Sequence, residues 1–425
     1  MMNIIYNPSK DEWNRILRDS NKGTQENGVE KIVESIALRG DEALLEFLEN
    51  FDGIKLNASE LEITPEELDE VEILITPQLK SAINCAINNV SMFHKAQEIE
   101  DVRVETMPGV VCRQKSVPIS TVGLYIPGGT APLFSTVIML AVPAKIAGCK
   151  EIILCTPPAK NGKIAPEVLY CAKKCGVTKI FRVGGPAAIA AMAYGTDTIP
   201  RTDKIFGPGN NFVTAAKQIV AKDICAIDMP AGPSEVMIIA DQSANPKYIA
   251  ADFLAQLEHG KGSQAILATS SQKLAEDALN ELEKQLSSLS RQDYINDSLQ
   301  NSRIIVVATE EEMVDMANMY APEHLIICTK NYNSIVEKIE NAGSIFLGNY
   351  TPESAGDYAS GTNHTLPTGG WARSFSGVNL ASFTKRITIQ EITEEGLKIL
   401  APTIECMAKA EGLDAHANSV ITRLN

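Results

Sequence analysis

Apolar residues follow two different patterns along the chain. Over the first hundred residues they return every three or four positions, as Val29, Val33 and Ile36 do, which is the spacing of one helix face. This pattern predicts helices over residues 28–50 and 64–100. From about residue 120 the pattern changes to short continuous apolar runs, separated by segments long enough to be helices, which indicates a different architecture.

Continuous apolar runs are typical of parallel strands that are buried on both faces. Their alternation with helix-length segments occurs twice, around residues 122–240 and 236–348. We therefore expect an α/β fold with two doubly wound, Rossmann-like units. The predicted strands cover residues 122–126, 151–156, 179–184, 204–207, 236–241, 264–270, 303–309, 324–329 and 344–348.

The length of 425 residues suggests two to three domains. We expect an N-terminal helical segment over residues 1–23, before a first α/β domain formed by residues 24–121 and 236–373. A second α/β domain covers residues 122–235 and contains glycine-rich loops. The remaining residues, 374–425, form a helical tail, which is too short to fold alone and should dock on another part of the protein.

Composition narrows the function classes. The net charge of −15, without a cluster of Lys and Arg, disfavours nucleic-acid binding and binding to an anionic membrane. The N-terminus lacks the pattern of a signal peptide, and the most apolar stretch, Pro132–Cys149, is too short and too broken to span a bilayer. Nine cysteines without paired spacing indicate reduced thiols. We expect a cytoplasmic protein.

Histidine is scarce, and four of the five histidines lie in segments that also contain carboxylates or glycines. In AQLEHG, Gln256 and His259 are three residues apart and would project from the same face of a helix. A histidine with a neighbouring oxygen ligand suits zinc. On its own, the segment is better explained as an exposed helix end with unremarkable polar residues.

Two further segments contain candidate chemistry. The stretch ESAGDYASGTNHTLPTGG, residues 353–370, is predicted to be a loop that contains Asp357 and His364. In APEHL, Pro322 precedes Glu323 and His324 at the start of a predicted strand, where neutral histidine would be a general base near pH 7. A flexible surface loop and a capped strand start explain these two segments equally well when each is taken alone.

Glycine-rich loops follow three predicted strands, at residues 123–129, 184–185 and 207–210. This is where α/β folds bind ligands. None of the loops has the G-x-G-x-x-G dinucleotide pattern, since Phe212 occupies the third glycine position of GPGNNF, and no Walker A sequence is present. A nucleotide ligand is compatible with these loops without being specified by them.

Together, these segments resemble the histidinol dehydrogenase family. The matching segments appear in the family's order across residues 122–368. They are VGLYIPGGTAPLFSTVIMLAVPAKIAGC, KIFGPGN, DMPAGPSEVMIIAD, ADFLAQLEHG, MYAPEHLI and FLGNYTPESAGDYASGTNHTLPT. The resemblance implies an enzyme that oxidises L-histidinol through L-histidinal to L-histidine with NAD and one Zn²⁺ per subunit, as a homodimer with shared sites.

The resemblance also implies site residues. It places the zinc ligands at Gln256, His259, Asp357 and, from the partner subunit's tail, the residue that matches His416. It implies that His324 is the base and Glu323 the acid that activates water. The substrate contacts would include those ligands, His324 and three more residues, and two residues would contact NAD. These five residues are Ser234, His364, Glu411, Tyr125 and Asn210.

One position departs from the family pattern. Relatives usually have a Gln that contacts the dinucleotide where this chain has Ala187, and an alanine side chain cannot make that hydrogen bond. This puts the affinity for NAD in question, but not the metal site or the base. Trp371, just after the loop, adds bulk to which no role can be assigned.

Three alternatives stay open at this point. A zinc-dependent hydrolase of a small amino-acid-like substrate would use the same ligands and a Glu-activated water without a nucleotide. A non-catalytic binding protein would leave the histidines unexplained. Within the dehydrogenase, a thiohemiacetal on Cys112 or Cys149 could replace the hydrate, although neither thiol has a basic neighbour in sequence.

Overall fold

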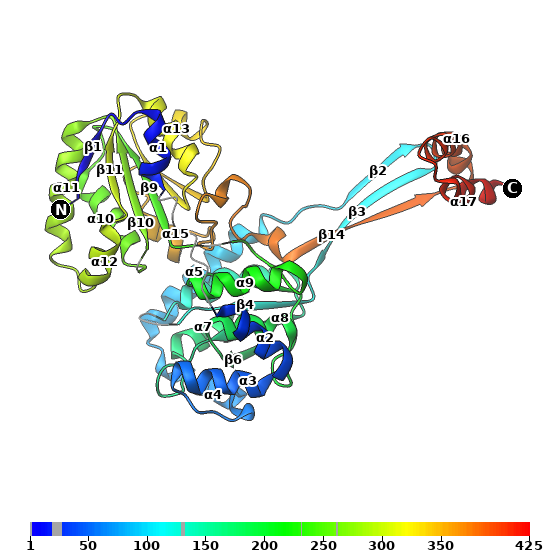
Figure 1. Ribbon diagram of the computed structural model, residues 1–425, viewed down its shortest axis with the longest axis horizontal. Coiled ribbons are helices and arrows are strands. Elements are labelled where there is room, and N and C mark those ends of the chain that lie inside the picture. The colour runs from blue at the N-terminus through cyan, green and yellow to red at the C-terminus, as the bar shows by residue number, and fades with distance from the viewer. Residues whose placement is uncertain (1, 19–27, 129–131, 231, 261) are drawn as a thin grey trace.

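The computed structural model describes residues 2–18, 28–128, 132–230, 232–260 and 262–425. It has two α/β bodies and a long arm that projects away from both of them (Figure 1). The predicted α/β class, with two doubly wound parallel units, is confirmed. Within the described residues, none of the helices has the length and apolar character needed to cross a membrane.

The first body contains a six-stranded parallel sheet with the order β1-β11-β10-β9-β12-β13. Its strands are β1 (Ile4–Tyr6), β9 (Glu235–Ala240), β10 (Gln264–Thr269), β11 (Arg303–Val306), β12 (His324–Cys328) and β13 (Ser344–Leu347). Its helices are α1 (Lys10–Leu17), α10 (Pro246–Leu257), α11 (Gln272–Leu286), α12 (Gln292–Leu299), α13 (Glu310–Tyr320), α14 (Tyr332–Val336) and α15 (Glu353–Tyr358).

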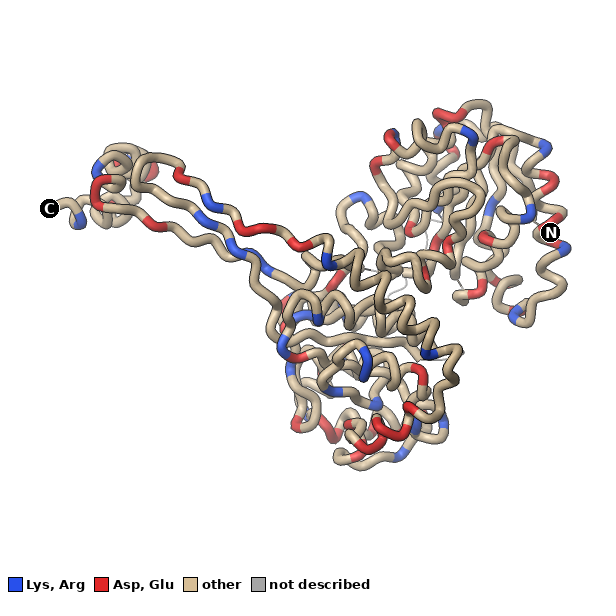
Figure 2. The backbone as a smooth tube through the Cα atoms, turned by 180° about the vertical axis from the view of Figure 1, so that it is seen from behind, with Lys and Arg blue, Asp and Glu red and all other residues tan. Residues whose placement is uncertain are grey.

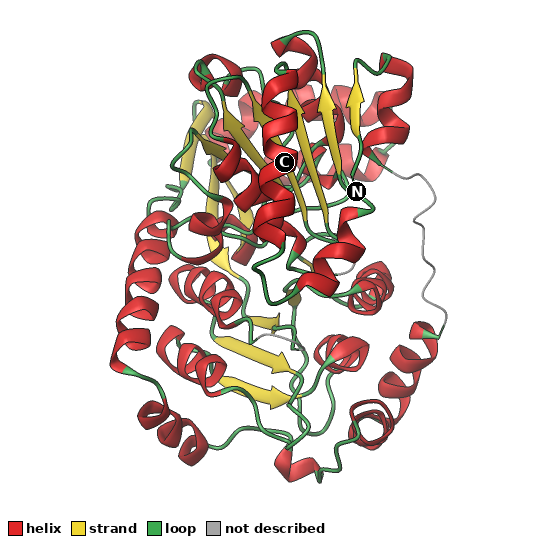
Figure 3. Ribbon diagram, turned by 90° about the vertical axis from the view of Figure 1, so that its left-hand side faces the viewer, coloured by secondary structure: helices red, strands yellow, loops and turns green. Residues whose placement is uncertain are grey.

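Strand β9 shows why these runs are apolar throughout. Its Val236 and Ile238 pack with α10, α11 and α12 on one face, whereas Met237 and Ile239 pack with α1, α13 and α14 on the other. Figure 3 shows helices on both faces of this sheet. Burial of such a side chain contributes about 1.5–3 kcal/mol, so both faces favour apolar residues.

The second body contains a five-stranded parallel sheet with the order β6-β5-β4-β7-β8. Its strands are β4 (Thr121–Tyr125), β5 (Glu151–Thr156), β6 (Lys179–Arg182), β7 (Lys204–Phe206) and β8 (Ala226–Ile227). Its helices are α2 (Val29–Arg39), α3 (Asp41–Phe47), α4 (Pro65–Leu74), α5 (Pro77–Lys95), α6 (Phe134–Ala147), α7 (Pro166–Cys175), α8 (Gly185–Tyr194) and α9 (Asn211–Asp223).

The packing of the N-terminal helices differs from the predicted grouping. Residues 24–121 were expected to join residues 236–373, but Val33 shares a core with Ile153, and Val90 shares another with Val122. The helices α2–α5 therefore belong to the second body, because their apolar faces cover its sheet. Nor do residues 1–23 form a purely helical segment, since β1 is the edge strand of the first sheet; residues 19–23 lie outside the described residues.

The arm is an antiparallel sheet with two helices at its tip. Its strands, in the order β14-β3-β2, are β2 (Val102–Met107), β3 (Val110–Pro118) and β14 (Thr384–Ile392), followed by α16 (Glu394–Ala410) and α17 (Asp414–Leu424). The tail was predicted to be helical, which is wrong for β14. Its nine residues pair with all nine of β3, and this partner is too distant in sequence for a local pattern to indicate.

Short helical turns complete the described structure: a π-helical turn at Leu48–Asp52 and 3-10 turns at Ala58–Glu60, Trp371–Arg373 and Leu380–Phe383. Acidic and basic residues are interspersed along both bodies and the arm (Figure 2). On the arm, for example, Arg113 of β3 lies 3.7 Å from Glu391 of β14.

Candidate active site

The candidate residues meet between two opposite sheet edges. Tyr125 is the last residue of β4 and Gly207 follows β7, at the carboxyl edge of the five-stranded sheet. Ser234 and Glu323 immediately precede β9 and β12, at the amino edge of the six-stranded sheet. A small cavity is lined by Gly207, Ser234, Glu323 and His364 together. The carboxyl-edge rule for α/β folds therefore applies to the second body only.

Three side chains form a candidate metal site. His259 lies just beyond the end of α10, and Glu353 and Asp357 are four residues apart on α15, so they share a helix face. One ligand atom from each of the three lies within 4.8 Å of the others, and His259 Nε2 is 4.0 Å from Asp357 Oδ2. Because tetrahedral zinc takes nitrogen and oxygen ligands at about 2.0–2.2 Å, small side-chain movements would bring these atoms to bonding distance.

Gln256 joins the same group through Glu353. With the amide turned to satisfy both side chains, its nitrogen donates to the two Glu353 carboxylate oxygens at 2.6 and 3.1 Å. Gln256 is completely buried, so the interpretation of this segment as an exposed helix end with unremarkable polar residues is wrong for Gln256. The predicted loop over residues 353–370 also begins as a helix, α15.

His324 and Glu323 contact the backbone of a single residue, Glu235. The backbone N–H of Glu235 donates to Glu323 Oε2 at 2.8 Å, and its carbonyl lies 3.2 Å from His324 Nδ1. Since a carbonyl can only accept, Nδ1 bears the hydrogen and Nε2 has the lone pair. Nε2 lies 3.8 Å from Asp357 Oδ1, so the basic nitrogen is next to the candidate metal ligands.

Burial sets the protonation of this pair. It lowers the pKa of His324 to about 3, so the imidazole is neutral and its Nε2 lone pair is unprotonated. Burial raises the pKa of Glu323 well above its usual range, and the nearby carboxylates of Glu235 and Asp357 raise it further. A cation bound at Asp357 would favour the ionised form of Glu323.

His364 connects α15 to α6. Its Nδ1 lies 2.8 Å from the Asp357 carbonyl, and its Nε2 lies 3.1 Å from the Thr136 hydroxyl. By the same reasoning as for His324, Nδ1 bears the hydrogen and Nε2 accepts from Thr136. Burial lowers the pKa of His364 to about 4, so it is a neutral side chain in the cavity.

The residues predicted to contact NAD lie on the second body. The Tyr125 hydroxyl accepts a hydrogen bond from the Gly185 backbone N–H at 3.1 Å, and Asn210 caps α9 by accepting from the Val213 N–H at 3.1 Å. Gly207 has φ +127°, and a Cβ there would lie 2.1 Å from the Tyr125 carbonyl oxygen, so only glycine fits. Gly129 of the first glycine loop lies outside the described residues. Ala187 is completely buried within α8.

The predicted residues of the tail do not reach this site within one chain. Glu411 and His416 lie at the helical tip of the arm, far from both sheets in Figure 1. The candidate thiols also lie elsewhere: Cys112 is on β3, and Cys149 follows α6, where burial raises its pKa to about 11. A thiol with that pKa would be a poor nucleophile.

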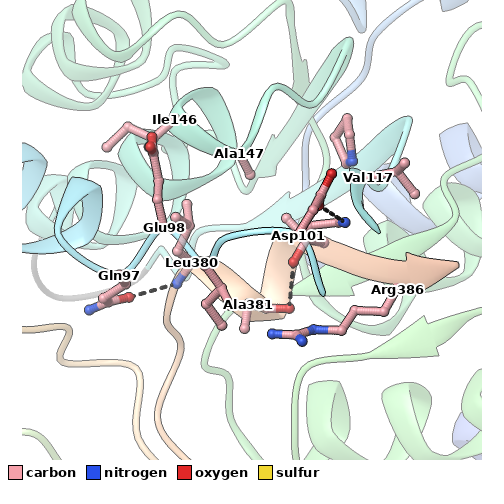
Figure 4. A pocket seen from close by; sticks show the side chains of 13 residues that line it. Gln97, Glu98, Asp101, Val117, Ile146, Ala147, Leu380, Ala381 and Arg386 are labelled. Carbon is pink, nitrogen blue, oxygen red and sulfur yellow. Dashed lines mark hydrogen bonds between the residues drawn. The ribbon is translucent and has the colours of Figure 1, made fainter. Parts of the chain in front are cut away.

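A second cavity lies at the root of the arm. It has a volume of about 280 Å³. Figure 4 shows Gln97, Asp101, Leu380 and Arg386 around it, and Gln97 Oε1 accepts from the Leu380 N–H at 2.9 Å. Since none of the predicted site residues lines it, the active-site interpretation stays with the cavity between the two sheet edges.

Sequence reasoning missed several residues of this site. Glu353 is four residues before Asp357, a spacing that would have placed it on the same face had the segment been taken as a helix. Arg18, Thr136 and Glu235 gave no comparable signal. Their contacts join segments that are far apart in the sequence, and no local spacing indicates such contacts.

The family model and the relatives with high sequence identity indicate one family. The family model described as histidinol dehydrogenase matches residues 17–424. Histidinol dehydrogenase from Bacteroides thetaiotaomicron is 54% identical over 427 residues, covering 100% of this chain and 99% of the relative, and the one from Vibrio cholerae is 51% identical over 93% of this chain and 91% of the relative. The crystal structure of histidinol dehydrogenase from Elizabethkingia anophelis covers 100% of this chain and 98% of its own, with a TM-score of 0.96 and 46% identity. With this match from end to end, the chain belongs to the histidinol dehydrogenase family.

Proposed function

We propose that this protein oxidises L-histidinol to L-histidine in two steps through L-histidinal, with NAD as the hydride acceptor. The observation that carries the proposal is the position of the lone pair on His324 Nε2, 3.8 Å from Asp357 in a group of metal-type ligands. Family membership supports the reaction class. The place of this reaction is the end of histidine biosynthesis.

Zn²⁺ suits the site because a histidine nitrogen and two carboxylates lie within reach of one ion. We propose that Gln256, His259 and Asp357 hold it, with His416 of the partner subunit as the fourth ligand. Zinc held in this site would coordinate the amino and imidazole nitrogens of the substrate and so orient it.

In the first step, His324 Nε2 accepts the proton of the substrate hydroxyl. At the same time the carbon that bears this hydroxyl transfers a hydride to NAD. The hydrogen bond from Nδ1 to the Glu235 carbonyl keeps the imidazole in the tautomer that can accept this proton.

In the second step, Glu323 accepts a proton from a water that adds to the aldehyde carbon. The resulting hydrate anion loses a hydride to a second NAD, which gives the carboxylic acid, and Glu323 afterwards releases its proton to solvent. We propose that Ser234 and His364 contact the substrate, because both line the cavity that Glu323 also lines. Tyr125 and Asn210 are the proposed contacts to NAD.

We further propose a homodimer in which each tail completes the site of the other subunit. The arm exposes apolar side chains on a sheet that no described helix covers along its length, among them Val104 at 49% and Ile387 at 43% exposure. Such a surface favours contact with a partner. An exchanged tail would supply the second set of substrate and metal contacts, Glu411 and His416.

The direct test follows the ultraviolet absorbance of NADH in zinc-loaded protein supplied with L-histidinol and NAD. The proposal expects two equivalents of NADH for each histidinol consumed, with histidine as the product. Absence of NADH, together with zinc-dependent cleavage of an amide substrate, would instead support a hydrolase.

A further inference from the structure

One guanidinium group connects the segments that hold the proposed acid and base. Arg18, just after α1, donates from Nη1 and Nη2 to the two carboxylate oxygens of Glu235, at 2.6 and 3.1 Å. Its Nη2 also donates to the Tyr320 carbonyl at 2.6 Å, and its guanidinium lies 4.3 Å from the centre of the Tyr320 ring. The N-terminal segment thus contacts both β9 and the end of α13.

Glu235 is the residue whose backbone contacts both members of the pair. Its N–H donates to Glu323, and its carbonyl accepts from His324 Nδ1. Its side chain is nearly buried and accepts a third hydrogen bond, at 3.1 Å, from the Gly369 N–H. The position of the Glu235 backbone therefore sets the position of both side chains.

Tyr320, the last residue of α13, fixes the start of the short segment that leads to Glu323 and His324. Its carbonyl, bound by Arg18, comes three residues before Glu323, and the next residue, Ala321, has φ +51°. A non-glycine residue in this left-handed region is strained and persists only where its surroundings hold it. The Tyr320 hydroxyl donates to Gln264 Oε1 at 2.7 Å, which fixes the ring against β10.

We infer that Arg18 is a positioning residue for Glu323 and His324, acting through Glu235 and through the Tyr320–Ala321 turn. The inference rests on the proposed function, since it presumes that this pair acts on substrate. An arginine is required because its planar guanidinium donates two parallel hydrogen bonds to a carboxylate and a third to a carbonyl. A lysine ammonium is a single point charge and cannot reproduce this geometry.

The test compares Arg18→Ala and Arg18→Lys with Lys10→Ala in the full-length, zinc-loaded enzyme. Lys10 is a matched control because it attaches the same helix, α1, to α13 through Asp315 at 2.8 Å without contacting the pair. We expect Arg18→Ala to lower kcat about ten- to hundredfold, the loss that a small misplacement of catalytic groups causes, with little change in KM for either substrate. Lys10→Ala should retain the wild-type kcat.

Two further measurements separate positioning from folding. Added guanidinium ion should restore part of the kcat of Arg18→Ala, and Arg18→Lys should fold with a melting temperature close to wild type yet keep a lowered kcat. A wild-type kcat in Arg18→Ala would overturn the inference. So would a loss of activity that guanidinium does not restore and that comes with a raised KM for NAD.

A readout without turnover distinguishes this inference from the proposed function. The protein has five histidines, so ¹⁵N-histidine labelling gives few ring signals, and His324→Ala identifies the one of interest. The Nδ1–H signal of His324 should be present in wild type and in Lys10→Ala, and shifted or broadened in Arg18→Lys. An unchanged signal in Arg18→Lys would overturn the inference, even in a protein that did not oxidise histidinol.

Discussion

Glu323 and His324 are adjacent in sequence but serve different half-reactions in the proposed function. His324 accepts a proton during the first oxidation, and Glu323 activates water only for the second. Both are buried and contact the same residue, Glu235, so a substitution at one changes the shape of the site little when the replacement has the same size. The two steps can therefore be separated by mutation.

We expect Glu323→Gln to slow the second oxidation far more than the first. A glutamine keeps the volume but cannot accept the proton of water, which removes a contribution of about 10²–10⁴ to that step. Rapid mixing with histidinol should then show one NADH formed per site in a fast phase, with the second formed slowly. Equal slowing of both phases would contradict the assignment of Glu323 to the second oxidation alone. The His324→Ala variant should lack the fast phase.

Asp52 gives a prediction for stability. Burial raises the pKa of this carboxyl, and its Oδ2 is buried without a hydrogen-bond partner in the part of the chain that the structure describes. As pH rises past about 4, the unfolded carboxyl ionises before the folded one does, so folding loses stability until the folded carboxyl also ionises.

Asp52→Asn removes this effect. We expect its melting temperature to exceed that of wild type at pH 7 and to match it near pH 3, where the carboxyl is neutral in both states. Asp197→Asn, at an exposed position between α8 and β7, should show no such pH-dependent difference. A difference between Asp52→Asn and wild type that does not change between pH 3 and pH 7 would disprove the assignment.

The individual site residues show what sequence could supply. Gln256, His259 and Asp357 were predicted because they lie in segments that resemble a family. In the structure His259 lies 4.0 Å from Asp357, and Gln256 contacts Glu353 of the same group. Glu353 was within reach through its helical spacing. Arg18 was not, because an ion pair with Glu235 across more than two hundred residues depends on how the whole body packs.

Among the elements, α15 combines a structural and a chemical function. Its sequence, ESAGDY, contains a glycine and a serine and was predicted to be part of a loop. In the structure it forms a short helix with Glu353 and Asp357 on the same face. The next histidine, His364, is bound to its last turn through the Asp357 carbonyl. The candidate metal site therefore depends on this one helix together with the end of α10.

Asp357→Asn should weaken zinc binding strongly, because a charged ligand is replaced by a neutral amide. Zinc content after dialysis against a weak chelator should fall well below one ion per subunit, while wild type retains its metal. Glu258→Gln is the matched control, since Glu258 is the neighbour of His259 in sequence but is not among the grouped ligands. Equal zinc retention by both variants would exclude Asp357 as a ligand.

The strands show which elements can be predicted from the pattern of apolar residues. Nine of the eleven described strands of the two large sheets were predicted to within three residues at each end, because burial on both faces leaves a continuous apolar run, whereas the short edge strands β1 and β8 were missed. The strands of the arm were missed because β2 is largely exposed and β3 is mostly only partly buried, so no continuous apolar run indicates them, and because β14 pairs with β3 from the far end of the chain.

For the whole molecule, the main prediction concerns how two chains share their sites. His416→Ala and His324→Ala should each be inactive as homodimers, since one lacks a metal ligand and the other lacks the base. After subunit exchange, a mixed dimer would contain one intact site, built from the body of the first variant and the tail of the second.

An equal mixture should therefore recover about a quarter of wild-type activity, because about half of the dimers are mixed and each has one good site of two. The measurement is histidinol-dependent NADH formation before and after exchange. If activity stays absent although mass spectrometry shows mixed dimers, then each subunit uses its own tail.

The long arm, which separates the tail from both bodies, predicts complementation between certain mutant alleles. With exchanged tails, a lesion in the body of one chain and a lesion in α16 or α17 of the other would fall in the same site of a mixed dimer and leave its second site intact. A cell carrying one allele of each kind could then grow without added histidine, although neither allele alone would support growth. Two alleles with lesions at the same end of the chain would not rescue each other, and a map of such pairs would divide the gene at the codons of the arm.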